Sequence, residues 1–346
     1  MRTELFDYEL PESAIAQRPS VERGASRMLE VGAELVDRQA HDFAELVPEG
    51  ALVVLNDTRV RRARLLGERV PGGGKVEVFL LYPLDAERKR WSALGRANKP
   101  LRPGTELLIG DARALVHERL DDGTLVVELC VAASALEVED WLERQGHVPL
   151  PPYVRRPDDA SDGERYQTVF ARELGSVAAP TAGLHLSKAA LTRLEERGVD
   201  VQTLTLHVGI GTFRPVSAAD LDEHPMHSEH IEVGDALCTR VNQARADKRP
   251  VIAVGTTVVR ALESAAQSGE MRAFKGETRL LIQPGYGFQV VDGLLTNFHM
   301  PKSTLLALVS ALVGREKLLA AYREALARGY RFLSYGDAMW IPRRLV

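Results

Sequence analysis

The feature that most restricts the fold is a change of pattern between residues 60 and 148. Six short runs of alternating apolar and polar residues follow one another there, over 63–68, 75–82, 91–97, 105–109, 112–118 and 124–130. Several of the turns between them are rich in Gly, Pro or Asp, and Asp122-Gly123 is a typical hairpin signal. This pattern predicts a small antiparallel barrel or sandwich, closed by a helix over 134–144.

Strand and helix signals alternate outside this region, which is typical of an α/β domain. Ala51–Leu55 and Val251–Gly255 are continuous apolar runs, as expected of buried parallel strands. We also expect a helix over 165–174 and a last strand over 330–335. The proline-rich stretch 147–153 suits neither a helix nor a central strand, so we interpret it as the crossing back from the insert. The sequence therefore predicts a discontinuous α/β domain, residues 1–59 and 149–346, with a mostly parallel sheet and an inserted antiparallel β-barrel, residues 60–148.

Residues 178–216 combine small side chains, hydroxyls and two histidines. A loop over 180–185 leads into a short helix capped by Ser187, and a predicted strand over 201–208 ends in a glycine-rich segment. Ligands of open α/β sheets bind at the carboxyl ends of strands, and glycine lets them approach the backbone closely. The alternative is a plain turn, helix and strand with two buried, satisfied histidines. The candidate site residues are Thr181, Gly183, His185, His207, Gly209, Gly211, Thr212 and Phe213.

A second candidate follows the strand at 251–255, where Thr256 and Thr257 begin a helix. Free N–H groups at a helix start suit a carboxylate, a phosphate or a ribose hydroxyl. Arg260 lies one turn further on; the alternative is a capped helix whose Arg260 forms a surface ion pair with Glu263. Gly209-x-Gly211 falls short of a dinucleotide fingerprint, because the sixth position is Arg214.

Aromatic residues occupy loops that follow predicted strands in the last third of the chain. Such side chains can stack on an adenine or on an unpaired base. Burial in the core is the alternative for each of them. The residues in question are Tyr286, Phe288, Phe298 and His299.

A cluster of arginines follows the strand at 51–55 and includes Arg59, Arg61, Arg62 and Arg64, just after Asp57. Guanidinium groups match phosphate oxygens, and a dense cluster in a chain of net charge −4 favours a nucleic-acid contact. The alternative is a solvated edge strand that is protected by its charges.

A candidate metal site consists of His224, His227 and His230, with Glu229 between them. Pro225 breaks a helix that would align the three, and a strand would point His227 away from the others, so we expect no metal. The two cysteines form no Cys-x-x-Cys pair, and neither a signal peptide nor a membrane-length apolar run is present. We expect a cytoplasmic protein with no membrane contact, and a monomer.

Six motifs, none diagnostic alone, together resemble the S-adenosylmethionine:tRNA ribosyltransferase-isomerase family of queuosine biosynthesis. The similarity runs from Phe6-Asp7-Tyr8 to Tyr335-Gly336-Asp337-Ala338-Met339. In order, the motifs are Asn56–Val60, Pro180–His185, His207–Phe213, Met226–Glu229, Gly255–Thr257 and Asn297–Ser303.

This resemblance implies a fold, a reaction and its substrates. The family combines an α/β domain with an inserted β-barrel. It transfers the ribosyl part of S-adenosylmethionine to 7-aminomethyl-7-deazaguanine at the wobble position of a tRNA, and isomerises the ribose to give epoxyqueuosine with release of adenine and methionine. S-adenosylmethionine and tRNA are then the co-substrates, and no metal is required.

Such chemistry needs a base for the acidified ribose C–H, a proton for departing adenine and a neutral attacking amine. Histidine can serve the first two roles near neutral pH, so we assign His207 or His185 as the base and the other to adenine. Asp57 or Glu229 would orient the amine. Thr256, Thr257 and residues 209–212 would hold the nucleoside and the methionine carboxylate, and the four arginines would contact tRNA phosphates. The alternative function is an RNA-binding or metal-dependent hydrolytic protein on the same scaffold.

Overall fold

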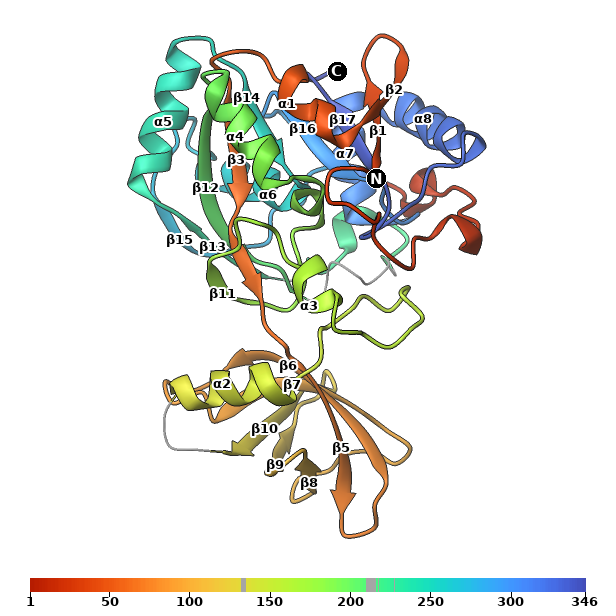
Figure 1. Ribbon diagram of the computed structural model, residues 1–346, viewed down its shortest axis with the longest axis vertical. Helices are drawn as coiled ribbons and strands as arrows, with labels where there is room; N and C mark the ends of the chain where they lie inside the picture. Colours follow the sequence, from red (N-terminus) through yellow and green to blue (C-terminus); the bar gives the residue numbers. More distant parts are fainter. Residues whose placement is uncertain (132–134, 210–215, 217, 227) are drawn as a thin grey trace.

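The structure is a computed structural model that describes residues 1–131, 135–209, 216, 218–226 and 228–346. An α/β domain lies above a smaller β-barrel in Figure 1, and two segments of chain connect them. No helix in the described ranges is both long and apolar enough to cross a membrane.

The α/β domain is built on a nine-stranded sheet in the order β15-β13-β12-β3-β14-β16-β17-β1-β2. The run β12-β3-β14-β16 is parallel and β1 pairs in parallel with β17, whereas the pairs β15-β13, β13-β12, β16-β17 and β1-β2 are antiparallel. The strand bounds are β1 Arg27–Val31, β2 Leu35–Gln39, β3 Leu52–Asn56, β12 Asp200–His207, β13 Glu229–Val233, β14 Val251–Val254, β15 Phe274–Thr278, β16 Gly293–Asn297 and β17 Ala338–Ile341.

Helices cover both faces of this sheet, which explains why β3 and β14 are almost entirely apolar. In β3, Val53 and Leu55 belong to one buried cluster and Leu52 and Val54 to another, because successive side chains point to opposite faces. The first cluster includes α1 (Phe43–Leu46) and α4 (Lys188–Glu196). The second includes α5 (Asp235–Ala246), α6 (Thr256–Ala265), α7 (Thr304–Val313) and α8 (Arg315–Ala327). Short 3-10 helices lie at Thr3–Phe6, Glu12–Ala14, Ala40–Asp42, Thr181–His185 and Leu221–Glu223.

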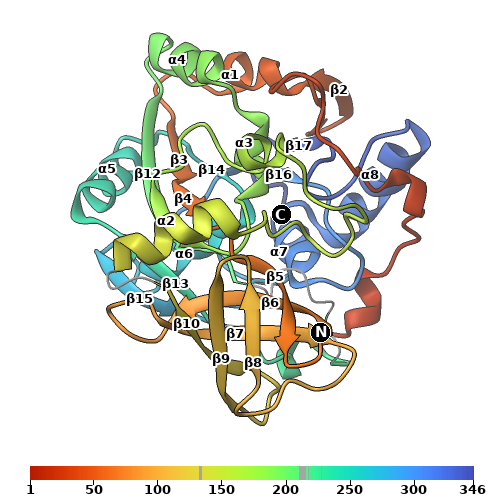
Figure 2. The ribbon, with the colours of Figure 1, turned by 60° about the horizontal axis from the view of Figure 1, so that its bottom comes forward.

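The predicted insert is a closed barrel in the strand order β10-β7-β6-β5-β8-β9. Its bounds are β5 Arg64–Val70, β6 Lys75–Pro83, β7 Arg90–Ala97, β8 Glu106–Ile109, β9 Ala112–Arg119 and β10 Leu125–Cys130. Alternate residues such as Val76, Val78 and Leu80 fill its core. Helix α2 (Ala135–Gln145) lies between the barrel and the α/β domain, as Figure 2 shows. The α/β domain with an inserted barrel is thus confirmed.

The junction between the two parts depends on a buried charge cluster. Arg61 follows the short strand β4 (Thr58–Val60), which pairs with β11 (Glu173–Ser176). The Arg61 guanidinium donates three hydrogen bonds to Glu139 of α2 and lies 4.9 Å from the Trp91 ring centroid. Arg88 also pairs with Glu139. These contacts fix α2 to the chain that enters the barrel.

Two expected elements are wrong. Instead of a helix over 165–174, helix α3 covers Asp162–Arg165 and strand β11 follows, because the N–H groups of Arg172 and Glu173 donate to the Asp57 carbonyl. Residues 330–335 form no strand, and Phe332 makes only an isolated bridge to Ile15. The last strand is β17, and in both cases tertiary pairing overrides the local sequence preference.

Candidate active site

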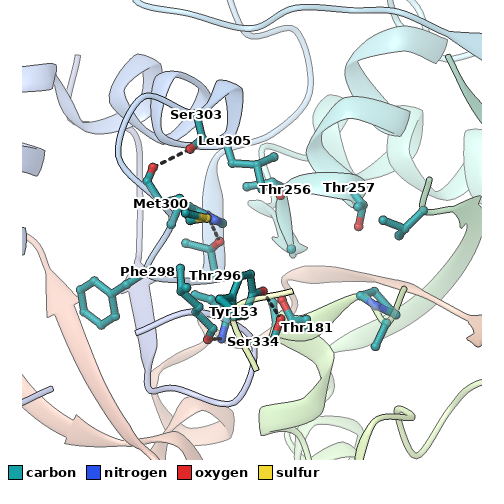
Figure 3. A pocket seen from close by; sticks show the side chains of 18 residues that line it. Tyr153, Thr181, Thr256, Thr257, Thr296, Phe298, Met300, Ser303, Leu305 and Ser334 are labelled. Carbon is teal, nitrogen blue, oxygen red and sulfur yellow. Dashed lines mark hydrogen bonds between the residues drawn. The ribbon is translucent and has the colours of Figure 1, made fainter. Parts of the chain in front are cut away.

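A cavity opens where β14 and β16 end. This is the carboxyl edge of the sheet, where a ligand site was expected. The free volume of the cavity is about 70 Å³, well below the ~300–1,000 Å³ of typical ligand pockets. A nucleoside therefore requires it to widen, and the flexible side chain of Met300 is suited to move. Hydroxyl groups are frequent in the lining, and Figure 3 shows them. The hydroxyl-bearing residues are Tyr153, Thr181, Thr256, Thr257, Thr296, Ser303 and Ser334.

The start of helix α6 forms one wall of this pocket. Gly255 joins β14 to α6 with a φ of 99°, a backbone conformation that favours glycine. The first N–H groups of any helix lack an intrahelical acceptor, and Gly255 at the N-cap has no side chain that could supply one. Thr256 and Thr257 are nearly buried here and both line the pocket. This arrangement suits a carboxylate or a ribose hydroxyl.

His185 does not line the pocket but holds a residue that does. Its Nε2 lies 3.0 Å from Asn297 Nδ2, and its Nδ1 lies 2.7 Å from Ser26 Oγ. Asn297 Nδ2 also donates to the Leu333 carbonyl. Because a carbonyl can only accept, the amide nitrogen and not the amide oxygen must face Leu333 and His185. Nε2 of His185 is therefore the acceptor and Nδ1 carries the proton. Burial lowers the pKa of His185 to about 4.

Asn297 Oδ1 is buried, and none of the residues that the structure describes forms a hydrogen bond with it. Because both amide hydrogens are engaged, this oxygen is the free part of a side chain that lines the pocket. It can accept a hydrogen bond from an N–H or O–H of a ligand once the pocket widens. Asn297 lies within one of the six motifs but was not among the predicted site residues. Its position at the end of the buried strand β16 is the sequence signal that could have identified it.

His207 ends strand β12, one residue before Val208, which lines the pocket. Its Nδ1 lies 2.7 Å from Thr58 Oγ1, and its ring stacks on His230 with the centroids 6.2 Å apart. A Cβ at Gly175 would lie 2.6 Å from the His207 ring, so only glycine fits there. Burial, and then the neighbouring His230, lower the pKa of His207 to about 4. The imidazole is accordingly neutral, and competent as a base, at neutral pH.

The two candidate carboxylates are each buried and held by an arginine. Asp57 accepts hydrogen bonds from Arg172 and from the Thr205 hydroxyl, both at 2.7 Å. Glu229 pairs with Arg260 inside the protein, so Arg260 is not the surface residue of the capped-helix alternative. Neither carboxylate lines the pocket.

The expected aromatic residues differ in their positions. His299 lines the pocket, its Nε2 lies 2.9 Å from Thr296 Oγ1, and burial lowers its pKa to about 3. Phe298 also contributes to the pocket lining, but its ring points away from the other labelled side chains in Figure 3 and stacks on Phe332. Tyr286 packs on Phe288 and lies outside the pocket lining. The core-burial alternative thus describes the Phe298 ring.

The arginine cluster is less exposed than we expected. Arg61 is 3% exposed and fully engaged by Glu139, so it is not free to bind phosphate as predicted. Arg64 pairs with Glu77. Arg59 and Arg62 share Glu143 and keep 45% and 37% of their side-chain surfaces exposed.

Some expected residues cannot be placed. Gly211, Thr212, Phe213 and His227 lie outside the described residues, whereas Gly209 is described. Thr181 and Gly183 belong to the 3-10 helix at 181–185, and Thr181 lines the pocket. Among the residues that can be placed, no three His, Cys, Asp or Glu side chains gather in a way that could hold a metal ion.

The chain matches known proteins along nearly its whole length. The model of a family described as queuosine biosynthesis protein matches residues 3–341. An S-adenosylmethionine:tRNA ribosyltransferase-isomerase from Sorangium cellulosum is 53% identical over 99% of this chain and 98% of its own. Its counterpart in Geobacter sulfurreducens is 48% identical over 97% and 98%. The crystal structure of S-adenosylmethionine tRNA ribosyltransferase from Thermotoga maritima is 31% identical, with a TM-score of 0.55, and covers 97% of this chain and 99% of that one.

Proposed function

The chain belongs to the queuosine biosynthesis protein family, and from that premise we propose that it is an S-adenosylmethionine:tRNA ribosyltransferase-isomerase. It transfers and isomerises the ribosyl part of S-adenosylmethionine onto 7-aminomethyl-7-deazaguanine at the wobble position of a tRNA, yielding epoxyqueuosine, adenine and methionine. The observation that carries this proposal is the end-to-end identity of about half of all residues with enzymes of that name. Nothing in the comparisons supports the alternative of a metal-dependent hydrolase or a plain RNA-binding protein.

The pocket at the ends of β14 and β16 is the proposed site for the nucleoside. Its hydroxyl groups suit a ribose, and the uncapped start of α6 suits the methionine carboxylate of the donor. Asn297 Oδ1 supplies an acceptor for the adenine amino group or for a ribose hydroxyl.

His207 is the better candidate for the base that removes the ribose proton. Its neutral state at pH 7 and its hydrogen bond to Thr58 both favour a fixed, unprotonated ring nitrogen. His185 has both nitrogens engaged inside the protein, which supports a positioning role through Asn297 instead of direct proton transfer to adenine. Asp57 and Glu229 remain the candidates for orienting the amine. Each carboxylate is itself held in place by an arginine.

The exposed arginines Arg59 and Arg62 are the members of the original cluster that remain suited to tRNA phosphates. Each shares its ion pair with a partly exposed glutamate, and such surface pairs are weak enough to rearrange. A tRNA substrate also supports the expected cytoplasmic location, and we propose that the enzyme acts as a monomer.

The decisive experiment incubates chelator-treated protein with S-adenosylmethionine and tRNA that carries 7-aminomethyl-7-deazaguanine. The tRNA is then digested, and its nucleosides are weighed by mass spectrometry while free adenine is quantified. We expect an epoxyqueuosine mass with equimolar adenine, and none with tRNA that carries guanine at the wobble position. No product, or product that appears only after divalent metal is restored, would contradict the proposal.

A further inference from the structure

A groove of about 780 Å³ runs between the barrel and the proline-rich crossover at residues 149–158. One wall is the outer surface of β5, β6 and β7, and the other is the crossover with its prolines. Its size falls within the ~300–1,000 Å³ range of pockets that hold small ligands. The groove contains none of the residues that line the pocket described above.

The barrel wall of this groove is apolar although it faces outward. Along β6 the side chains of Val76, Val78 and Leu80 fill the barrel, which leaves Phe79 on the outer face. Phe79 is in register with Leu94 of β7, and Leu66 of β5 keeps 43% of its surface exposed. An apolar strip that contains a phenylalanine, opposite prolines, provides a surface on which a flat ring can stack.

Guanidinium groups line the same groove. Arg96 is exposed, and no ion pair joins it to any residue that the structure describes. Glu77, its register partner, is occupied by Arg64 through two hydrogen bonds. Arg155 forms only a surface pair with Glu12, with 69% and 74% of the two side chains exposed, so it can exchange its partner. Phe79 is itself partly buried, and arginine beside a partly exposed aromatic ring is the combination that binds an unpaired nucleotide by stacking and by phosphate contact.

The groove and the pocket share one segment of chain. Tyr153 lines the pocket and bonds Ser334 Oγ at 2.5 Å, whereas its neighbours Pro152 and Val154 line the groove. The groove and the pocket therefore adjoin at this segment.

We propose that this groove binds an unpaired nucleotide of the anticodon loop that flanks the modified one, with its base on Phe79 and its phosphate near Arg96. This inference rests on the proposed function for the identity of the RNA. The crossover would then lie between two neighbouring nucleotides, with the modified nucleotide in the pocket and its neighbour in the groove.

The test measures the Kd of the full chain for a synthetic anticodon stem-loop RNA across a series of salt concentrations. Arg96→Gln is compared with Arg119→Gln, which removes an exposed arginine of β9 that does not line the groove. We expect R96Q to raise Kd and to flatten the salt slope by roughly one unit, and R119Q to change neither. Phe79→Leu should raise Kd at least about fivefold through the loss of stacking. Leucine keeps an apolar side chain there, and thermal unfolding verifies that the barrel remains folded.

A second set of RNAs identifies the bound nucleotide. Each carries an abasic site at one of the two positions that flank the wobble nucleotide. At the position that occupies the groove, wild type and F79L should bind the abasic RNA equally, because the base that distinguishes them is missing. If F79L raises the Kd by the same factor for every RNA, abasic or not, the inference is overturned.

The outcomes separate this inference from the proposed function. If wild type forms product while R96Q and F79L match R119Q in Kd and salt slope, the groove is not the RNA site and the function stands. If wild type forms no product but the variants and the abasic RNA show the expected coupling, the groove binds RNA and the reaction must be another.

Discussion

The Nε2 atom of His185 accepts a hydrogen bond from Asn297 Nδ2 at 3.0 Å, and this contact helps to hold the Asn297 amide with its oxygen left for a ligand. The Leu333 carbonyl accepts the second amide hydrogen, and Ser26 holds the other nitrogen of the imidazole. A histidine that does not itself line the pocket thereby orients a polar group that does.

The first prediction is that His185 and Asn297 act as one unit. His185→Ala should lower kcat/KM for S-adenosylmethionine by roughly tenfold, because the Asn297 amide then keeps only the Leu333 carbonyl as an acceptor and is held less firmly with Oδ1 available to a ligand. Asn297→Ala should lower it by at least as much, and the double variant should equal N297A alone, since coupled residues are not additive. Steady-state kinetics of adenine release measures all four proteins. If the fold decrease in kcat/KM of the double variant equals the product of the two single decreases, His185 acts independently of Asn297.

Replacement of His207 should damage the chemical step itself. His207→Ala should reduce turnover at least about 10²-fold, the usual contribution of a general base, with little change in the Kd for tRNA. His117→Ala is the matched control, because His117 is a barrel residue whose ring pairs only with Glu128. Single-turnover formation of modified tRNA is the measurement. A folded H207A protein with near wild-type turnover would remove this residue from the mechanism.

The start of α6 should contribute to binding of the donor. Thr256→Val preserves the shape of the side chain but removes a hydroxyl that lines the pocket. The loss of one hydrogen bond should raise KM for S-adenosylmethionine about threefold to tenfold. Thr239→Val on α5, which removes a hydroxyl bonded to the Asp235 carbonyl, should leave KM unchanged. Equal KM values for the two variants would show that Thr256 does not contact the donor.

The arginines at the domain junction should separate into structural and surface residues. Arg61→Ala should lower the free energy of unfolding by about 3 kcal/mol, because it leaves the buried Glu139 with Arg88 alone. Arg62→Ala should cost less than about 1 kcal/mol, because its pair with Glu143 is partly exposed. Denaturant unfolding gives both values. Similar losses in the two variants would contradict this division.

Stability should decrease as the pH falls below about 6.5. Burial lowers the pKa of His185 to about 4 and that of His299 to about 3, so the folded protein binds fewer protons than the unfolded chain in this range. Their stabilising contribution is thus complete above the unfolded pKa, near ~6.5, and is lost as the pH falls toward the folded values. Each histidine contributes a slope of up to about 1.4 kcal/mol per pH unit. His185→Asn should reduce the slope of unfolding free energy against pH by about one proton, whereas His41→Asn, at an exposed position, should not.

Much of the architecture followed from local sequence. Apolar and polar residues alternate in strands that are buried on one face, as in the insert, whereas strands buried on both faces are continuous apolar runs such as Ala51–Leu55. Each segment therefore shows in its own residues which of its faces are buried. The barrel and the strand ends around Asn56 and Gly255 were therefore predictable. Segment 165–174 was not, since its backbone pairs with Asp57, more than 100 residues away in the chain.

The sequence by itself determined the order of the elements, the insertion of the barrel and the set of polar residues at the strand ends. Only the tertiary structure decided which of them face the pocket: His185 turned out to support Asn297, Arg61 to hold the domain junction, and Phe298 to fill the core. The reason is physical. Burial and hydrogen-bond partners arise from contacts between distant segments, and these contacts determine whether a histidine or an arginine is free for a substrate or already engaged.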